Sequence, residues 1–493
     1  MKRYLIRSGI APTEVRTPEE MIQKNLIGSN VGNLIYAYSI YRNLMTENVE
    51  IVPDKYRINE NDADMINKYY DAYIIPLADA FRDTFVKNLE KYTKLFKKLT
   101  IPVIVVGVGV KAPINKRIED GFSFDKEVKD FINAVLERSN IIGVRGQITA
   151  DYLNYLGFTE GVDHTVIGCP SMYTFGRDLK IKELNLKENS SIALSSSKLS
   201  PEHVLKFITS VSDDFPNYYF IPQWRKEFQM TYIGNQELAQ NTDFYPNSIQ
   251  GKYYEEDKVR YPLNAKKWID FMKDMDLAVG ARLHGNITAT IAGTPSLLLA
   301  KDARMKELAE YHNLTHLGEK DIKDETTLKD VINKLDFHSP EYVQKENFDH
   351  FINFLEKNEL DHIYNYDYHS YPPLDQQIDK IDLPGMLKPI NDLTPIDISN
   401  RLTGYIDLKN KNISNLKEDK TKLNKNIKNL EKDIKDLKKE NEMKENNLRK
   451  QQESLQKTSK ELKYLTHQSQ RKSVRLALKF GDALALFKRK VKK

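Results

Sequence analysis

The chain has 493 residues, 40% of them hydrophobic and 10% aromatic, a length that predicts two or three domains. Its single cysteine, Cys169, excludes a disulfide framework and a thiolate metal cluster. No apolar stretch is long enough for a signal peptide or a membrane span, so we expect a cytoplasmic protein. Residues 471–493 hold nine Lys or Arg and one Asp; because the net charge is +5, the rest of the chain carries about −3 and is not expected to bind nucleic acid.

A glycine-rich loop precedes the first predicted helix. Gly28, Asn30, Gly32 and Asn33 come directly before an amphipathic stretch that starts at Leu34. Such a loop can present the amides of a helix N-terminus to an anion or a sugar, so we take Asn30, Gly32 and Asn33 as candidate substrate-binding residues. The alternative is an ordinary glycine turn with asparagine capping.

Strands and helices then alternate. Strands are predicted over Tyr73–Pro76, Ile101–Val106 and Ile141–Val144, with a helix over Phe85–Leu99 as the crossover of a parallel unit. The third strand ends at Arg145, which places this side chain at the carboxyl edge of the sheet, where ligands bind. A solvated arginine is the alternative.

The same alternation returns in the second half of the chain. Strands over Ile192–Leu194 and Tyr218–Ile221 flank a helix over Pro201–Val211. Gln223 and Trp224 follow the second strand. An aromatic ring beside polar groups is typical of sugar binding, although Trp224 could equally belong to the core.

The segment from residue 276 to 307 holds the strongest candidate site. Two apolar strands are predicted there, with a helix from Asn286 to Ala292 between them. The first strand, Leu277–Val279, is followed by Arg282 and His284, and the second, Ser296–Ala300, is followed by Arg304. The carboxyl ends of parallel strands meet at one edge of a sheet, and arginines beside a histidine suit an anionic substrate that needs proton transfer. Gly285 is a small residue where the backbone can approach a ligand. Taken singly, each side chain could instead be a structural hydrogen-bonding group.

These motifs resemble those of the polysaccharide pyruvyl transferases. The resemblance lies in the strand-Gly-x-Arg-Leu-His-Gly segment, the Ala-Gly-Thr-Pro turn and the Asp-x-Arg-x-x-Glu-Leu pattern after it, and it extends over roughly the first 390 residues. It implies two Rossmann-like α/β domains facing across a cleft, as in glycosyltransferases of the B type. It also implies transfer of pyruvate from phosphoenolpyruvate to a sugar of a cell-surface polysaccharide, free or lipid-linked, as a cyclic ketal.

The resemblance further implies roles for four residues. His284 would be the general acid or base, and Arg145, Arg282 and Arg304 would clamp the anionic donor. Phosphoenolpyruvate is then the donor substrate, and neither a further cofactor nor a metal is expected. A glycosyltransferase with a nucleotide-sugar donor and a non-catalytic scaffold of polysaccharide assembly are the alternatives.

Three positions depart from the family pattern. Asn33 stands where the family often has an aspartate, Cys169 stands where aspartate is common, and Arg304 stands where lysine is more frequent. The first departure weakens any role for a carboxylate at that loop, whereas Arg304 keeps the positive charge. We expect Cys169 to be a small buried residue.

A heptad pattern begins at Ile413. Its a and d positions are mostly Ile and Leu, which favours a parallel two-stranded coiled coil, and Asn441 at an a position would fix the register. A single charged helix is the alternative. Residues 471–493 would form a helix with one apolar side and basic residues, suited to the inner face of an anionic plasma membrane; a solvated basic tail is the alternative.

The predicted organisation therefore has five parts: an N-terminal Rossmann-like domain (1–180), a donor-binding Rossmann-like domain (181–340), a return helix and linker (341–400), a coiled coil (405–468) and a basic amphipathic tail (469–493).

Overall fold

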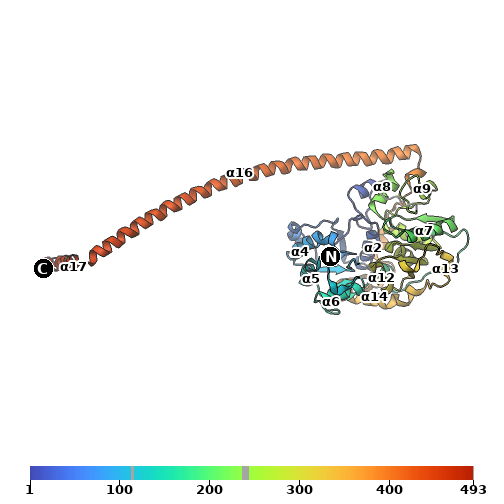
Figure 1. Cartoon of the computed structure of the whole chain (residues 1–493), viewed down its shortest axis with the longest axis horizontal. Coiled ribbons are helices and arrows are strands. Elements are labelled where there is room, and N and C mark those ends of the chain that lie inside the picture. The colour runs from blue at the N-terminus through green and yellow to red at the C-terminus, as the bar shows by residue number, and fades with distance from the viewer. Residues whose placement is uncertain (113–115, 236–243, 492–493) are drawn as a thin grey trace. The chain divides into compact units, whose positions relative to one another are not determined.

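A computed structural model of the protein describes residues 1–112, 116–235 and 244–491. The chain divides into two compact units, Met1–Leu408 and Lys409–Lys493. The first is a layered α/β structure and the second is helical (Figure 1). The parallel sheets of the first unit confirm the predicted α/β class.

The first parallel sheet is built from the N-terminal part of the chain. Its four strands have the order β2-β1-β3-β4, and the parallel pair β5-β6 continues it through a bridge between Val108 and Val144. The strands are short and rich in Ile and Val, which pack well when both faces of a sheet are covered. Their bounds are β1 Lys2–Ile6, β2 Val49–Pro53, β3 Ala72–Pro76, β4 Val103–Val106, β5 Ile142–Val144 and β6 His164–Val166.

The second parallel sheet follows in the chain. Its five strands have the order β11-β10-β9-β7-β8, so β9 and β10 are interior strands. The carboxyl ends of β9 and β10 therefore each have a neighbouring strand on both sides. The bounds are β7 Ile192–Ser195, β8 Tyr218–Phe220, β9 Leu277–Gly280, β10 Ser296–Ala300 and β11 His316–Gly318.

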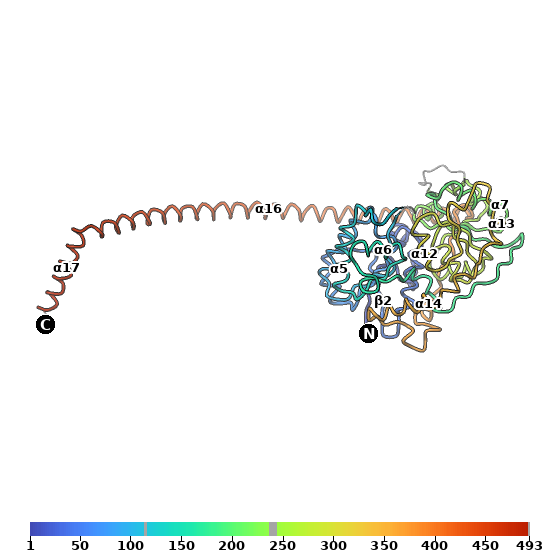
Figure 2. Tube along the Cα trace, turned by 60° about the horizontal axis from the view of Figure 1, so that its bottom comes forward, coloured from blue at the N-terminus to red at the C-terminus, as the bar shows by residue number. Residues whose placement is uncertain are grey.

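Helices connect the strands and cover both sheets. In two views of this unit, α5 and α6 lie at one end and α7 and α13 at the other (Figures 1 and 2). The bounds are α1 Pro18–Gln23, α2 Gly32–Leu44, α3 Ala63–Tyr69, α4 Val86–Phe96, α5 Asp125–Leu136, α6 Gln147–Tyr155, α7 Glu202–Asp214, α8 Arg225–Ile233, α9 Lys252–Glu255, α10 Ala265–Lys273, α11 Leu283–Ile291, α12 Ala303–Tyr311, α13 Leu328–Ile332, α14 Ser339–Lys357 and α15 Pro373–Ile378.

The two sheets share one hydrophobic core. Alternate residues of a strand face opposite sides of its sheet, and Ile74 of β3 and Leu298 of β10 belong to the same buried cluster, which also includes residues of α2 and α11. The opposite faces pack into separate clusters, represented by Tyr73 and Leu297. Because the shared cluster joins the sheets within one compact unit, two separate domains are not confirmed, and the predicted domain boundaries stay predictions.

Element bounds differ from the predicted ones at two instructive places. Strand β10 has the predicted bounds, but α11 begins at Leu283 instead of Asn286, because Arg282 takes the extended conformation of an N-cap. His284 therefore lies in the first turn of a helix rather than in a loop. Strand β1 was not predicted, although it lies between β2 and β3 in the first sheet.

Helix α14 returns to the first half of the chain, as expected. Its C-cap residue Asn358 accepts a hydrogen bond from the backbone N–H of Asn140 (3.2 Å) and donates one to the carbonyl of Ile141 (3.1 Å). These contacts lie directly before β5, so α14 supports the strand that leads to Arg145.

The last two helices have no buried residue. Helix α16 (Pro395–Gln470) runs from the first unit into the second, and α17 (Lys472–Val491) follows after Arg471. The Ile and Leu side chains at the predicted heptad positions are exposed in the single chain, from 40% for Ile413 to 75% for Leu455. Within the described residues, no helix has the length and apolar character needed to span a membrane.

Candidate active site

A cavity of about 560 Å³ lies where the carboxyl ends of strands from both sheets converge. Its walls come from the segments that follow β1, β3 to β5 and β7 to β10, and from the loop before α2. Its charge is strongly unbalanced, since seven basic side chains line it against two carboxylates: Arg7, Arg82, Lys111, Arg145, Arg282, Lys301 and Arg304 against Asp79 and Asp302. Such a cavity attracts anions.

The structure brings the eight predicted site residues together. Six line the cavity, namely Asn30, Asn33, Arg145, Arg282, His284 and Arg304. The remaining two lie against its walls: a Cβ atom at Gly32 would be 2.6 Å from Nδ1 of His284, and one at Gly285 would be 2.8 Å from Oγ of Ser195. Both glycines thus make room for neighbouring side chains. Their location agrees with the predicted site, while their roles stay predictions.

The loop before α2 is held by its own asparagines. Asn33 donates hydrogen bonds to the carbonyls of Ile27 (3.0 Å) and Gly28 (3.3 Å), and Asn30 accepts one from the backbone N–H of Gly32 (2.8 Å). The amide nitrogen of Asn33 is therefore engaged in shaping the loop.

His284 is surrounded by positive charge. Burial, and then the guanidinium groups of Arg145 and Arg304, lower the pKa of His284 to about 3. Its Nε2 atom lies 4.0 Å from Sγ of Cys169. The imidazole is therefore neutral at physiological pH and can accept a proton.

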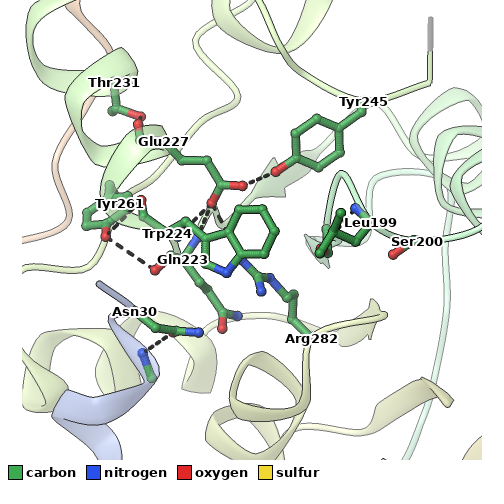
Figure 3. Close-up of polar contacts among 12 residues, drawn as sticks. Asn30, Leu199, Ser200, Gln223, Trp224, Glu227, Thr231, Tyr245, Tyr261 and Arg282 are labelled. Carbon is green, nitrogen blue, oxygen red and sulfur yellow. Dashed lines mark hydrogen bonds and ion pairs between the residues drawn. The ribbon is translucent and has the colours of Figure 1, made fainter. Parts of the chain in front are cut away.

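Arg282 is oriented by an aromatic ring and a buried carboxylate (Figure 3). Its guanidinium carbon lies 4.4 Å from the ring centroid of Trp224, and Nη2 lies 3.8 Å from Glu227. Glu227 in turn accepts hydrogen bonds from the backbone N–H groups of Gln223 (2.7 Å) and Trp224 (2.8 Å) and from the hydroxyl of Tyr245. Among the described residues, Nε and Nη2 of Arg282 have no hydrogen-bond acceptor, so both donors can serve a ligand.

Arg145 is almost fully buried, with 1% of its surface exposed. Its Nε and Nη2 atoms also lack an acceptor within the part of the chain that the structure describes. The adjacent turn is held by Glu307 of α12, which accepts hydrogen bonds from the backbone N–H (3.1 Å) and hydroxyl (3.2 Å) of Thr149. Burial raises the pKa of Glu307 to about 7. A residue of the helix between β10 and β11 of the second sheet thus fixes the helix that follows Arg145.

Arg304 differs from the other two arginines because carboxylates already hold it. Its Nη1 lies 2.9 Å from Asp79, and Nη2 lies 3.2 Å from Asp302. Asp79 also pairs with Arg82 at 2.6 Å. Arg304 therefore brings less free positive charge to the cavity than the sequence predicts, although its Nε has no acceptor among the described residues.

The model of the polysaccharide pyruvyl transferase family matches residues 30–302, more than half of the chain. The chain belongs to this family. The match confirms the resemblance found in the sequence, and it covers Asn30, Arg145, Arg282 and His284, with Arg304 just beyond its end. No protein of curated function matches the chain.

Several solved structures resemble this pyruvyl transferase family member weakly. UDP-GlcNAc 2-epimerase from Methanocaldococcus jannaschii, in complex with UDP-GlcNAc and UDP, is 13% identical, with 72% of this chain and 99% of that chain covered and a TM-score of 0.39. Anabaena HepE, in complex with UDP and glucose, is 13% identical over 77% and 98% of the two chains, with a TM-score of 0.32. An uncharacterized protein from Klebsiella pneumoniae is 14% identical over 63% and 88%, also with a TM-score of 0.32. Because these TM-scores are low, the fold is defined by the strand orders given above and not by the similarity to these structures.

Sequence reasoning missed several lining residues of this pyruvyl transferase family member. Arg7 was missed because β1 was not predicted, so no strand end was expected before it. Asp79 and Arg82 follow the predicted strand β3, and the rule that found Arg145 would have found both. Lys301 directly follows the predicted strand Ser296–Ala300, and the same rule would have found it. The described residues include no cluster of three His, Cys, Asp or Glu suited to hold a metal ion.

We expect inorganic phosphate to stabilise the protein through this cavity. Ligands that bind the folded state raise its unfolding free energy, by about 2.7 kcal/mol at a hundredfold excess over Kd. Thermal melts with and without phosphate at constant ionic strength should show a rise in Tm for the wild type, and Arg145→Met should lose most of it. The control Arg57→Met removes an arginine that is 67% exposed on its side chain and should keep the rise. Equal rises in all three proteins would contradict anion binding at this site.

Proposed function

We propose that the protein transfers pyruvate from phosphoenolpyruvate to two hydroxyl groups of a cell-surface polysaccharide sugar, forming a cyclic ketal. One observation carries the proposal: in a member of this family, buried arginines surround a neutral imidazole, and several of their nitrogens have no acceptor among the described residues. Phosphoenolpyruvate has an anionic group at each end, a phosphate and a carboxylate. Arg145 and Arg282 offer two buried nitrogens each, which suits bidentate contacts to such groups.

His284 is proposed as the general base. A neutral imidazole can take the proton of the sugar hydroxyl that attacks the central carbon of the donor, while the methylene carbon gains a proton. The second hydroxyl then attacks the same carbon, and the bond to the phosphate oxygen breaks. Overall, the donor trianion and a diol give a ketal carboxylate and hydrogen phosphate, which balances atoms and charge.

The acceptor sugar is proposed to lie near the loop before α2. Gln223 lines the cavity with a buried Nε2 donor that has no acceptor among the described residues, and Asn30 lies beside Trp224 in the same wall (Figure 3). Amides of this kind can bond sugar hydroxyls. One face of Trp224 is covered by Arg282, so this ring supports the arginine in addition to any contact with a sugar.

The second unit is proposed to dimerise the protein through α16. A row of exposed Ile and Leu at heptad spacing leaves apolar surface that a second copy of the helix would cover. The row consists of Ile413, Leu416, Leu423, Ile427, Leu430, Ile434, Leu437, Leu448, Leu455, Leu462 and Leu465.

Helix α17 is proposed to bind the inner face of an anionic plasma membrane. At about 100° per residue, five of its large apolar side chains fall in one arc of roughly 80°, and all of its bases fall outside that arc. The arc consists of Leu476, Phe480, Leu484, Phe487 and Val491, all at least 58% exposed. The bases outside the arc are Lys472, Arg475, Lys479, Lys488, Arg489 and Lys490. Such a helix suits an enzyme whose acceptor is lipid-linked.

The transfer reaction predicts the phenotype of a glycine variant. Gly32→Ala adds a Cβ atom 2.6 Å from Nδ1 of His284 and should displace the imidazole, whereas Gly385→Ala meets no atom within 4 Å. Mass spectrometry of the host's surface polysaccharide should show pyruvate ketals with the wild type and with Gly385→Ala. The initial rate of ketal formation, measured with the purified proteins, should be about 10²-fold lower for Gly32→Ala and for His284→Asn. Melting curves check that both variants fold.

Two outcomes would favour the alternatives. Turnover of sugar nucleotides, with no phosphate released from phosphoenolpyruvate, would favour a glycosyltransferase. Full biological function of His284→Asn would favour a non-catalytic scaffold.

The dimer is tested by mass in solution. Light scattering after size exclusion should give twice the 57.3 kDa of one chain for the wild type. Leu430→Glu at a d position should give monomers, because it places a charge in the seam. Lys432→Glu, on the outer side of the same helix, is the matched control. A monomeric wild type would end the proposal.

Membrane binding is tested by sedimentation with vesicles. The full chain should pellet with vesicles that contain phosphatidylglycerol and much less with pure phosphatidylcholine, since each base near an anionic surface adds about 1 kcal/mol. Phe480→Glu with Phe487→Glu should abolish pelleting, whereas Leu486→Glu, which falls among the bases, should lower it less. Equal losses in these variants would contradict an apolar membrane face.

A further inference from the structure

Lys301 lies in the same cavity as His284, Arg282 and Arg304. It is the first residue after β10, an interior strand of the second sheet. Its Nζ donates a hydrogen bond to Oγ of Ser200 (2.9 Å). The neighbouring carboxylate of Asp302 pairs with Arg304 and accepts a hydrogen bond from the backbone N–H of Met305 in the first turn of α12. Lys301 thus brings an ammonium group to the cavity with a hydroxyl as its hydrogen-bond partner.

The surroundings of Lys301 disfavour its charged form. Arg282 approaches from the start of α11 and Arg304 from α12, while Asp302 and, from the segment after β11, Glu319 partly offset them. Burial and then Arg282 lower the pKa of Lys301 to about 7. In the ligand-free cavity the amine therefore exchanges its proton near neutral pH, and a bound anion would favour its protonated form.

The proposed reaction needs a proton donor that His284 does not supply. Its imidazole is neutral when the reaction starts, so it can take the proton of the sugar hydroxyl, whereas its remaining N–H is too weakly acidic to protonate carbon. The arginines hold their protons too tightly to donate them. Glu307 is buried behind Thr149 and bonds to it. Lys301 lines the cavity and holds a proton that can be exchanged.

We propose that Lys301 is a second catalytic residue, the acid that protonates the methylene carbon of phosphoenolpyruvate after the anionic donor binds. This inference rests on the proposed function. The enol π electrons form the new C–H bond with the proton of Lys301, and the first sugar oxygen bonds to the central carbon while its proton passes to His284. As the second hydroxyl attacks, the phosphate leaves with that hydroxyl's proton. The proton on His284 then restores Lys301, so all protons are accounted for.

Proton uptake on donor binding provides the first test. Titration calorimetry of phosphoenolpyruvate in buffers of different ionisation enthalpy gives the number of protons bound. Above pH 7 the wild type should take up close to one proton per donor, because binding favours the charged amine. Lys301→Met should lose this uptake, whereas Lys111→Met, which removes another lysine of the cavity, should keep it. Uptake in Lys301→Met equal to that of the wild type would overturn the proposal.

A charge-conserving variant provides the second test. Lys301→Arg keeps a cation for donor binding but releases no proton near neutral pH, so the KM for phosphoenolpyruvate should stay near the wild-type value while kcat falls about 10²-fold. The wild-type rate should also fall as pH rises past the point where bound Lys301 loses its proton. Ketal formation by Lys301→Arg at the wild-type rate would overturn the role of Lys301 and leave the proposed function intact. Failure of the wild type to bind phosphoenolpyruvate would overturn both.

Discussion

The cavity of this protein concentrates positive charge that its own carboxylates do not balance. Burying like charges together costs free energy, and the structure offsets part of the cost with Asp79, shared by Arg82 and Arg304, and with Glu227 beside Arg282. The remaining guanidinium donors stay without acceptors in the part of the chain that the structure describes. An anionic ligand would satisfy them. Burial first, and this excess of charge second, lower the pKa values of His284 and Lys301, so the same enclosed cationic cavity acts on both groups.

Buried like charges repel one another, so the structure around the cavity must be rigid enough to hold them in place. The two sheets meet through a common hydrophobic cluster instead of through a flexible connection. Polar contacts add to it near the cavity: the backbone N–H of Val31 donates to the carbonyl of Gln223 at 2.8 Å, and Glu307 anchors Thr149. Segments distant in sequence are thereby fixed on either side of the ligand space. Preorganised donors of this kind lower the reorganisation needed during a reaction.

The sequence was most informative where one strand decides the position of a residue. Strand β10 has the predicted bounds, whereas β4 starts at Val103 instead of the predicted Ile101. The rule that ligands bind beyond strand carboxyl ends brought Arg145, Arg282 and His284 to one cavity. It was uninformative where a contact joins remote segments. Nothing in the chain indicates that Glu227 supports Arg282 or that Asp79 holds Arg304. The first pair depends on the strand order of the second sheet, and the second pair on how the two sheets pack. Strand β1 was missed since five residues with flanking charge carry little periodic signal, and Arg7 was missed with it.

Cys169 gives this molecule a practical property. It is the only cysteine of the chain, it is buried, and burial raises the pKa of its thiol. Maleimide reagents need an accessible thiolate, so the native protein should remain unlabelled while folded. A thiol introduced on an exposed helix, for instance by Ser454→Cys, would then be the sole attachment point for a dye. Fluorescence from that dye could follow the motions of α16 while Cys169 stays unmodified.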